Sequence, residues 1–147
     1  MADGTEAPKD LIGFLNFYLV EKAPFQIPDG VREFLVKYGP WIMLVFMVLS
    51  VPAILFLLGI GSFAVPFAGA GYAAGFGVAT IGLIANFALN ALALPGLFAR
   101  KMSGWTLLFY AELVSIATQL LQGAVISAII GGLIGLYILF QLRSLYK

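Results

Sequence analysis

The chain has no cysteine and no histidine among its 147 residues. Without cysteine it can form no disulfide, thiolate nucleophile or thiolate metal site. Without histidine it lacks the commonest metal ligand and the side chain that titrates near neutral pH. We therefore expect no metal site and no cofactor. Because acid–base and nucleophilic catalysis need paired reactive groups, we also predict that the protein is not an enzyme.

Charged side chains are scarce as well. Only 10% of the residues are charged, whereas 62% are apolar or aromatic. No charged side chain occurs from Tyr38 to Ala99, and a second uncharged run extends from Leu113 to Leu142. Apolar runs longer than about 18 residues are typical of membrane spans. The net charge of +1 gives no field for nucleic acid, so the sequence predicts an integral membrane protein whose surroundings are the lipid bilayer.

Proline and glycine interrupt the apolar runs and so divide them into spans. A stretch rich in glycine over 61–71 predicts an uncharged loop or a re-entrant corner, Pro95 ends a span, and Gly123 predicts a tight turn. A single helix over 105–142 would measure roughly 57 Å, well beyond a hydrocarbon core about 30 Å thick. The sequence therefore predicts an all-α, polytopic membrane protein with four transmembrane helices, at about 41–60, 72–94, 105–121 and 124–142.

The first 38 residues carry most of the charge and predict a cytoplasmic or interfacial region, 1–38, ahead of a four-helix transmembrane domain, 39–147. Apolar residues recur at helical spacing from Lys9 to Val20, which is typical of an amphipathic helix. Such a helix either lies in the headgroup boundary or packs against the rest of the protein, and both interpretations remain open. Asp29 is expected to cap a second short helix that ends near Tyr38.

With four spans, all eight Lys and Arg residues lie on one side of the membrane. The positive-inside rule makes that side cytoplasmic, with both termini inside, and fits a plasma (inner) membrane protein best. Arg100 and Lys101 follow the second span, and they are candidates for contact with anionic lipid headgroups. Trp105 is expected at the boundary between membrane and water.

Polar residues form two short rows within the predicted spans. Glu112, Ser115 and Gln119 share one face of the third span, while Asn86 and Asn90 share a face of the second. We expect the two rows to meet in a polar intramembrane seam. An ionisable residue in a span is a functional hypothesis by default, so the seam is a candidate ion or substrate site. Alternatively, it serves helix packing, with Glu112 paired to Arg100 or Lys101 at the cytoplasmic rim.

Small residues also recur four apart in the fourth span, at Ser127, Gly131 and Gly135. This spacing lets helix backbones approach closely, either within one chain or between chains. We therefore expect a homo-oligomer or a larger membrane complex.

Two functions fit these features. The first is a small non-catalytic accessory or scaffold subunit that packs with itself or with other membrane chains. The alternative is a small oligomeric transporter or channel that uses Glu112 with Asn86 and Asn90. In size, span number and possession of one intramembrane glutamate, the chain resembles the small multidrug-resistance transporters. In that family the glutamate lies in the first span, where this chain has no ionisable residue, so the resemblance assigns no site residue.

Overall fold

A computed structural model describes residues 11–147, which form helices and turns and no strand. Three helices, α2, α3 and α4, are long and apolar enough to cross a membrane. The prediction of an all-α fold is therefore confirmed for these residues, and the three helices support the prediction of a membrane protein. Residues 1–10 of the predicted surface region lie outside the described part of the chain. The elements in chain order are α1 (Leu11–Asn16), the π-helix η1 (Phe17–Glu21), α2 (Asp29–Phe98), α3 (Met102–Leu121), α4 (Val125–Leu142) and the 3-10 helix η2 (Arg143–Leu145).

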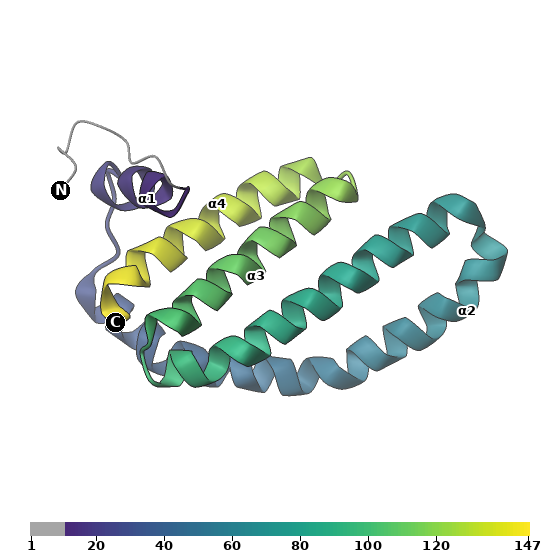
Figure 1. The fold of residues 1–147 in the computed structure, drawn as a ribbon, viewed down its shortest axis with the longest axis horizontal. Coiled ribbons are helices and arrows are strands. Elements are labelled where there is room, and N and C mark those ends of the chain that lie inside the picture. The colour runs from purple at the N-terminus through teal and green to yellow at the C-terminus, as the bar shows by residue number, and fades with distance from the viewer. Residues whose placement is uncertain (1–10) are drawn as a thin grey trace.

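The longest element, α2, folds back on itself at Gly69. Its two arms, 29–68 and 70–98, run antiparallel (Figure 1). Gly69 has φ 87° and ψ 173°, a conformation that is essentially restricted to glycine. The prediction of an open loop over 61–71 was wrong, because every residue of this stretch except Gly69 stays helical, whereas the corner expected there is the reversal at Gly69. A helix satisfies its own backbone hydrogen bonds, which an open loop in lipid cannot do.

The start of α2 also differs from the prediction. Pro28 occupies the N-cap position and Asp29 is already the first helical residue, so the prediction of Asp29 as the cap was wrong. The expected short helix does not end near Tyr38 but continues into the first arm. Four prolines lie inside α2, at 40, 52, 66 and 95. A proline removes one backbone donor, yet without competing water the helix on both sides persists.

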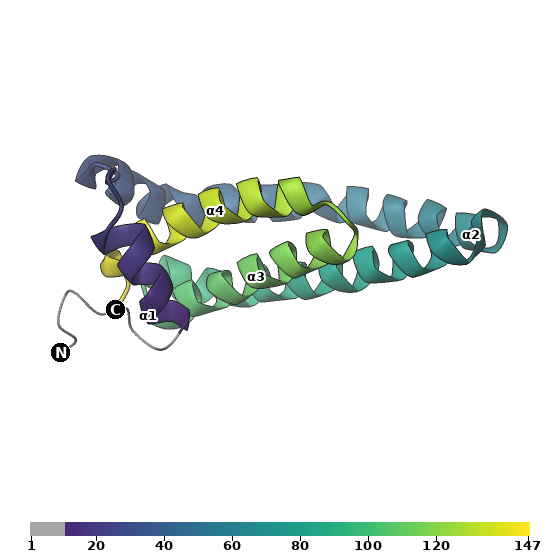
Figure 2. The same ribbon diagram turned by 90° about the horizontal axis from the view of Figure 1, so that it is seen from above.

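The second hairpin consists of α3 and α4. Its turn contains Gly123, whose φ of 78° again suits glycine. With 20 and 18 residues, α3 and α4 measure roughly 30 Å and 27 Å, whereas the first arm of α2 measures roughly 60 Å. The α2 hairpin consequently extends well past the α3–α4 turn (Figures 1 and 2). The most apolar 18-residue window of α2 contains no buried residue.

The buried core lies at the opposite end, where the beginning of α2, the beginning of α3 and the end of α4 meet; we call this the basic end. Trp105 is 1% exposed there and donates its indole N–H to the carbonyl of Leu139, 2.8 Å away. Its ring stacks on Phe109 and meets Phe140 edge to face, with centroids 5.7 Å and 5.1 Å apart. This aromatic cluster shields Trp105 from its surroundings, while its expected depth at the membrane–water boundary stays a prediction.

Residues 11–28, which we call the N-terminal segment, pack against the basic end of α4. Phe17 is buried, Gln141 donates to the carbonyl of Leu19 at 2.9 Å, and the Tyr137 hydroxyl donates to the carbonyl of Phe25. Of the two interpretations of this segment, contact with the protein body is the one that the structure shows. The segment still leaves an apolar edge exposed, formed by Leu11, Phe14 and Tyr18.

Candidate functional site

The two predicted polar rows meet between the second arm of α2 and α3. The side-chain amide of Asn86 donates to the carbonyl of Ala111 on α3, at 2.8 Å. Asn90, one turn along α2, donates to the backbone carbonyl and the side-chain oxygen of Asn86, at 2.8 Å and 2.7 Å. The asparagine pair thus reaches the residue that precedes Glu112. We keep the name polar seam for Asn86, Asn90, Glu112, Ser115 and Gln119.

Glu112 lies where the seam meets α4. Its carboxyl group packs against Gly135, and together they line a cavity of about 260 Å³ that Asn86, Asn90 and Ser115 also line. The ion pairs among residues 11–147 are Asp29–Arg32 and Glu33–Arg100. The alternative in which Glu112 pairs with Arg100 or Lys101 is therefore not what the structure shows, because the partner of Arg100 is Glu33.

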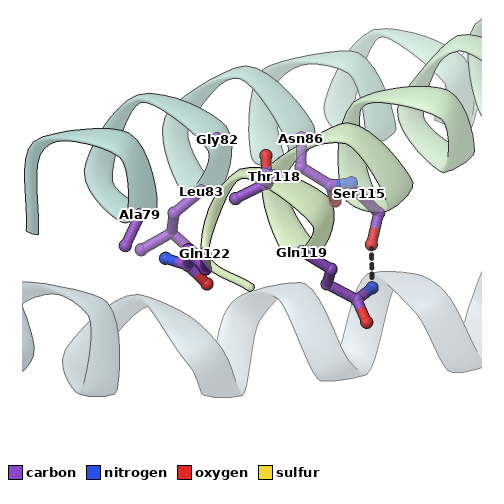
Figure 3. Close-up of a pocket in the computed structure, with 8 residues that line it drawn as sticks. All are labelled: Ala79, Gly82, Leu83, Asn86, Ser115, Thr118, Gln119 and Gln122. Carbon is purple, nitrogen blue, oxygen red and sulfur yellow. Dashed lines mark hydrogen bonds between the residues drawn. The ribbon is translucent and has the colours of Figure 1, made fainter. Parts of the chain in front are cut away.

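A second cavity, of about 300 Å³, continues the seam toward the α3–α4 turn (Figure 3). Gln119 donates to the Ser115 hydroxyl at 3.2 Å on its wall. Thr118 and Gly82 form the closest contact between α2 and α3 here, since a Cβ at position 82 would lie 2.3 Å from the Thr118 hydroxyl oxygen. Sequence reasoning missed Thr118, although it follows Ser115 by three residues, a spacing that places both on the same side of the helix.

A third cavity, of about 380 Å³, lies between the two arms of α2. Met47 and Ser50 line it from the first arm, Asn86 and Asn90 from the second. Asn86 thus lines all three cavities. Each seam residue remains partly exposed in the single chain, although all lie within the apolar helices. The structure therefore brings the predicted residues together in one seam, and this seam remains partly open to the surroundings of the single chain.

The basic pair at the end of α2 has a different setting. Arg100 pairs with Glu33, and this hydrogen bond holds the pKa of the Glu33 carboxyl below its ordinary value of 4.5. Lys101 is the N-cap residue of α3 and is exposed. Backbone hydrogen bonds join Lys147 to this turn. The Lys147 amide donates to the Arg100 carbonyl at 2.9 Å, and the Lys147 carbonyl accepts from the Met102 amide at 2.7 Å.

The chemistry available in the seam is that of amides, hydroxyls and one carboxyl group. Within residues 11–147, no group of three or more acidic, histidine or cysteine side chains could hold a metal ion. Compared with known proteins, the chain matches no protein family, no curated protein and no solved structure. Its function must therefore be argued from the seam and its surroundings.

Proposed function

We propose that this protein is a small, non-catalytic accessory or scaffold subunit that packs with itself or with another membrane chain in the plasma (inner) membrane. One observation carries the proposal: the five seam residues stay partly exposed between apolar helices. Polar groups in hydrocarbon need hydrogen-bond partners, and amides and hydroxyls on neighbouring helices supply them. A transmembrane helix with its own polar residues would complete the seam.

The small residues support the same proposal. A Cβ atom added at Gly131 on α4, or at Gly75 and Gly77 on α2, would meet no other atom within 4 Å. These positions therefore do not serve close packing inside this chain. Glycine at an open helix surface lets the backbone of another helix approach. The exposed apolar surface of the α2 hairpin offers further contact area to lipid or to a partner.

The proposal includes four membrane crossings, one for each arm of α2 and one each for α3 and α4. In this arrangement every Lys and Arg of residues 11–147 lies near the basic end, which the positive-inside rule makes cytoplasmic together with both termini. The uncharged part of the first arm, 38–68, measures roughly 47 Å and exceeds the core of about 30 Å. We expect the α2 hairpin to tilt or to extend beyond the outer surface.

A second candidate function, a small oligomeric transporter or channel, is favoured by the setting of Glu112. Its carboxyl group has no ion-pair partner among the described residues and lines a cavity of about 260 Å³ with Asn86 and Asn90. A membrane carboxyl group in such a cavity suits the binding of a proton or a cation. In this case the seam would be a water-filled path for the proton or cation rather than a contact between helices.

One comparison separates the two functions. The full chain is solubilised gently, and its assembly state and co-purifying chains are measured for the natural protein, Glu112→Gln and the control Glu33→Gln, which removes a carboxylate outside the seam. The scaffold proposal expects a stable assembly in all three proteins. The same proteins in vesicles are tested for proton-coupled ion flux, and flux that Glu112→Gln alone abolishes would replace the scaffold with the transporter. A monomer with no co-purifying chain would also contradict the scaffold.

A further inference from the structure

The basic end contains a cavity separate from the seam, of about 250 Å³, which we call the basal cavity. It lies where the N-terminal segment meets the beginnings of α2 and α3 and the end of α4. At about 30 Å³ per water molecule, it has room for a tetrahedral oxyanion with several waters. The polar and charged side chains that line the basal cavity are Asn16, Arg32, Gln141, Arg143, Ser144 and Tyr146.

The lining of the basal cavity is rich in hydrogen-bond donors and carries positive charge. Arg32 and Arg143 line it from opposite ends of the chain, and no described lining residue is acidic. The Nε atom of each arginine is buried and has no hydrogen-bond partner. A buried donor without a partner is costly, so both guanidinium groups favour an acceptor.

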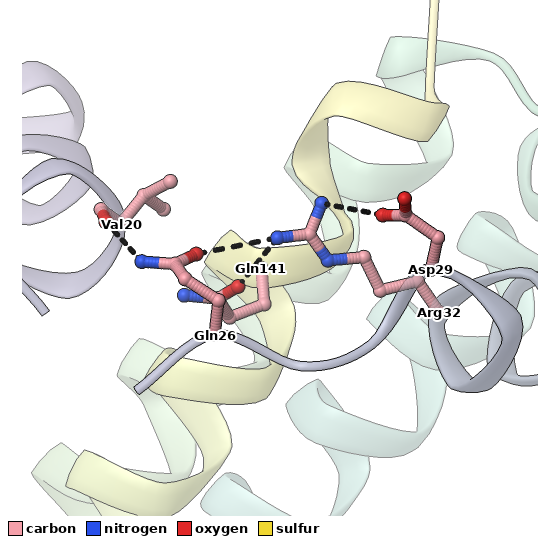
Figure 4. Close-up of polar contacts among 5 residues, drawn as sticks. All are labelled: Val20, Gln26, Asp29, Arg32 and Gln141. Carbon is pink, nitrogen blue, oxygen red and sulfur yellow. Dashed lines mark hydrogen bonds and ion pairs between the residues drawn. The ribbon is translucent and has the colours of Figure 1, made fainter. Parts of the chain in front are cut away.

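Polar contacts hold Arg32 in place (Figure 4). Arg32 donates to the side-chain oxygens of Gln141 at 2.8 Å and Gln26 at 3.3 Å, and Gln26 donates in turn to the carbonyl of Val20 at 2.5 Å. Its one carboxylate neighbour, Asp29, lies 3.6 Å away with its side chain 99% exposed. Such an exposed pair is weak, so the charge of Arg32 is only partly compensated.

The positive charge of Arg143 is less compensated than that of Arg32. It forms neither of the two ion pairs found among residues 11–147, and its guanidinium lies over the Trp105 ring at 5.3 Å. This contact fixes the guanidinium without neutralising it. Ser144 adds a hydroxyl donor to the lining. Glu21, the acidic residue of 11–28, accepts from the Asn16 amide at 3.5 Å.

We propose that the basal cavity binds a phosphate group, held by the guanidinium groups of Arg32 and Arg143 with help from Ser144. Guanidinium groups match phosphate oxygens with paired, charge-assisted hydrogen bonds. The proposed topology places the cavity at the depth of the cytoplasmic headgroups, where lipid phosphates are abundant. The phosphate comes from an anionic lipid or from a soluble phosphate, and the test separates these sources.

The test uses the full chain, purified in a neutral detergent and freed of lipid. Inorganic phosphate, short-chain phosphatidylglycerol and short-chain phosphatidylcholine are titrated, and binding is read by thermal shift and native mass spectrometry. Arg143→Gln is compared with Arg143→Lys, which keeps the charge, and with Lys37→Gln, which removes an exposed charge outside the cavity. The unliganded melting temperature and tryptophan fluorescence establish that each variant is folded.

We expect Arg143→Gln to weaken binding roughly tenfold or more, Arg143→Lys less, and Lys37→Gln by a factor of about two at most. Binding of inorganic phosphate would identify a site for soluble phosphate, whereas binding of phosphatidylglycerol alone would identify a headgroup site. The proposal is overturned if neither ligand binds the natural protein, if phosphatidylcholine binds as tightly as phosphatidylglycerol, or if Lys37→Gln weakens binding as much as Arg143→Gln. If Arg143→Gln does not fold, Arg32→Gln replaces it, and unchanged binding would contradict the proposal.

Discussion

The carboxyl group of Glu112 on α3 packs directly against the backbone of Gly135 on α4, so closely that an added Cβ atom would lie 2.4 Å from Oε1. The only acidic side chain of α3 and α4 thus lies against a glycine of the next helix. Both residues stand out in the sequence, one as an isolated acid and the other as part of a small-residue row. Only the packing of α3 against α4 brings them together.

Gly135→Ala should displace the Glu112 carboxyl group and lower the unfolding free energy by about 1 kcal/mol, because the end of a flexible side chain can move away. The control is Gly131→Ala, one turn earlier on α4, where a Cβ would meet nothing. That variant should be neutral or stabilised by up to about 1 kcal/mol, since alanine favours helix over glycine. Unfolding in detergent measures both, and equal stability of the two variants would show that the contact is absent.

Gly104→Ala should destabilise the protein more strongly. Its Cβ would lie 2.5 Å from the backbone nitrogen of Leu97 and 2.6 Å from the carbonyl carbon of Gly96. Backbone atoms cannot rotate away, so we expect a loss of about 3 kcal/mol or failure to fold. Gly77→Ala, at an open position of α2, serves as the control. A Gly104→Ala protein that unfolds like its control would contradict the close approach of α2 and α3.

The two tryptophans of the chain should behave differently. Trp105→Phe removes the donor to the Leu139 carbonyl and part of a buried ring, and should cost about 1–3 kcal/mol. Trp41 is 58% exposed, so Trp41→Phe should have little effect on stability. The Trp41→Phe protein reports Trp105 alone, and its fluorescence should be blue-shifted and resistant to aqueous quenchers. Strong quenching would instead place Trp105 at the water boundary.

The pair formed by Glu33 and Arg100 predicts a dependence of stability on pH. The hydrogen bond from Arg100 lowers the pKa of Glu33 in the folded protein below its ordinary value of 4.5. The unfolded state therefore takes up the proton first, and the stabilisation present above pH 4.5 is lost as the pH falls through the folded pKa. Melting temperatures from pH 3 to 6 should fall less steeply for Glu33→Gln than for the natural chain. Parallel curves would mean that the pair contributes nothing.

The sequence predicted the features of the seam that depend only on the spacing of residues along a single helix. Asn86 and Asn90 lie one turn apart, as do Ser115 and Gln119, so each row could be placed on a face before the structure was known. The unbroken helix through 61–68 could not be predicted from the sequence. Glycine and proline are ordinary loop signals in water, but they lose that meaning in lipid.

Contacts between segments that are distant in the chain could not be predicted from the sequence either. Arg32 and Gln141 are 109 positions apart and meet only because the beginning of α2 lies beside the end of α4. The burial of Trp105 in an aromatic cluster could not be predicted either, because no local pattern distinguishes such a tryptophan from one exposed at the membrane–water boundary. The basal cavity follows from such contacts and has no signature of its own in the chain.

We propose above that another membrane chain covers the seam, and that this contact keeps the seam dry. Because the chain has no cysteine, Gln119→Cys introduces the only thiol, and its reaction with a water-soluble methanethiosulfonate can be followed in native membranes. Lys37→Cys, at an exposed charged position, sets the rate in water, and Ile126→Cys, at a position 75% exposed on α4, sets the rate in lipid.

The Gln119→Cys protein should react far more slowly than the Lys37→Cys protein. A spin label at position 119 should also be less mobile than one at 126, because a neighbouring helix confines it. Reaction at the rate of the Lys37→Cys protein would contradict the account, because the seam would then be filled with water and open to solutes.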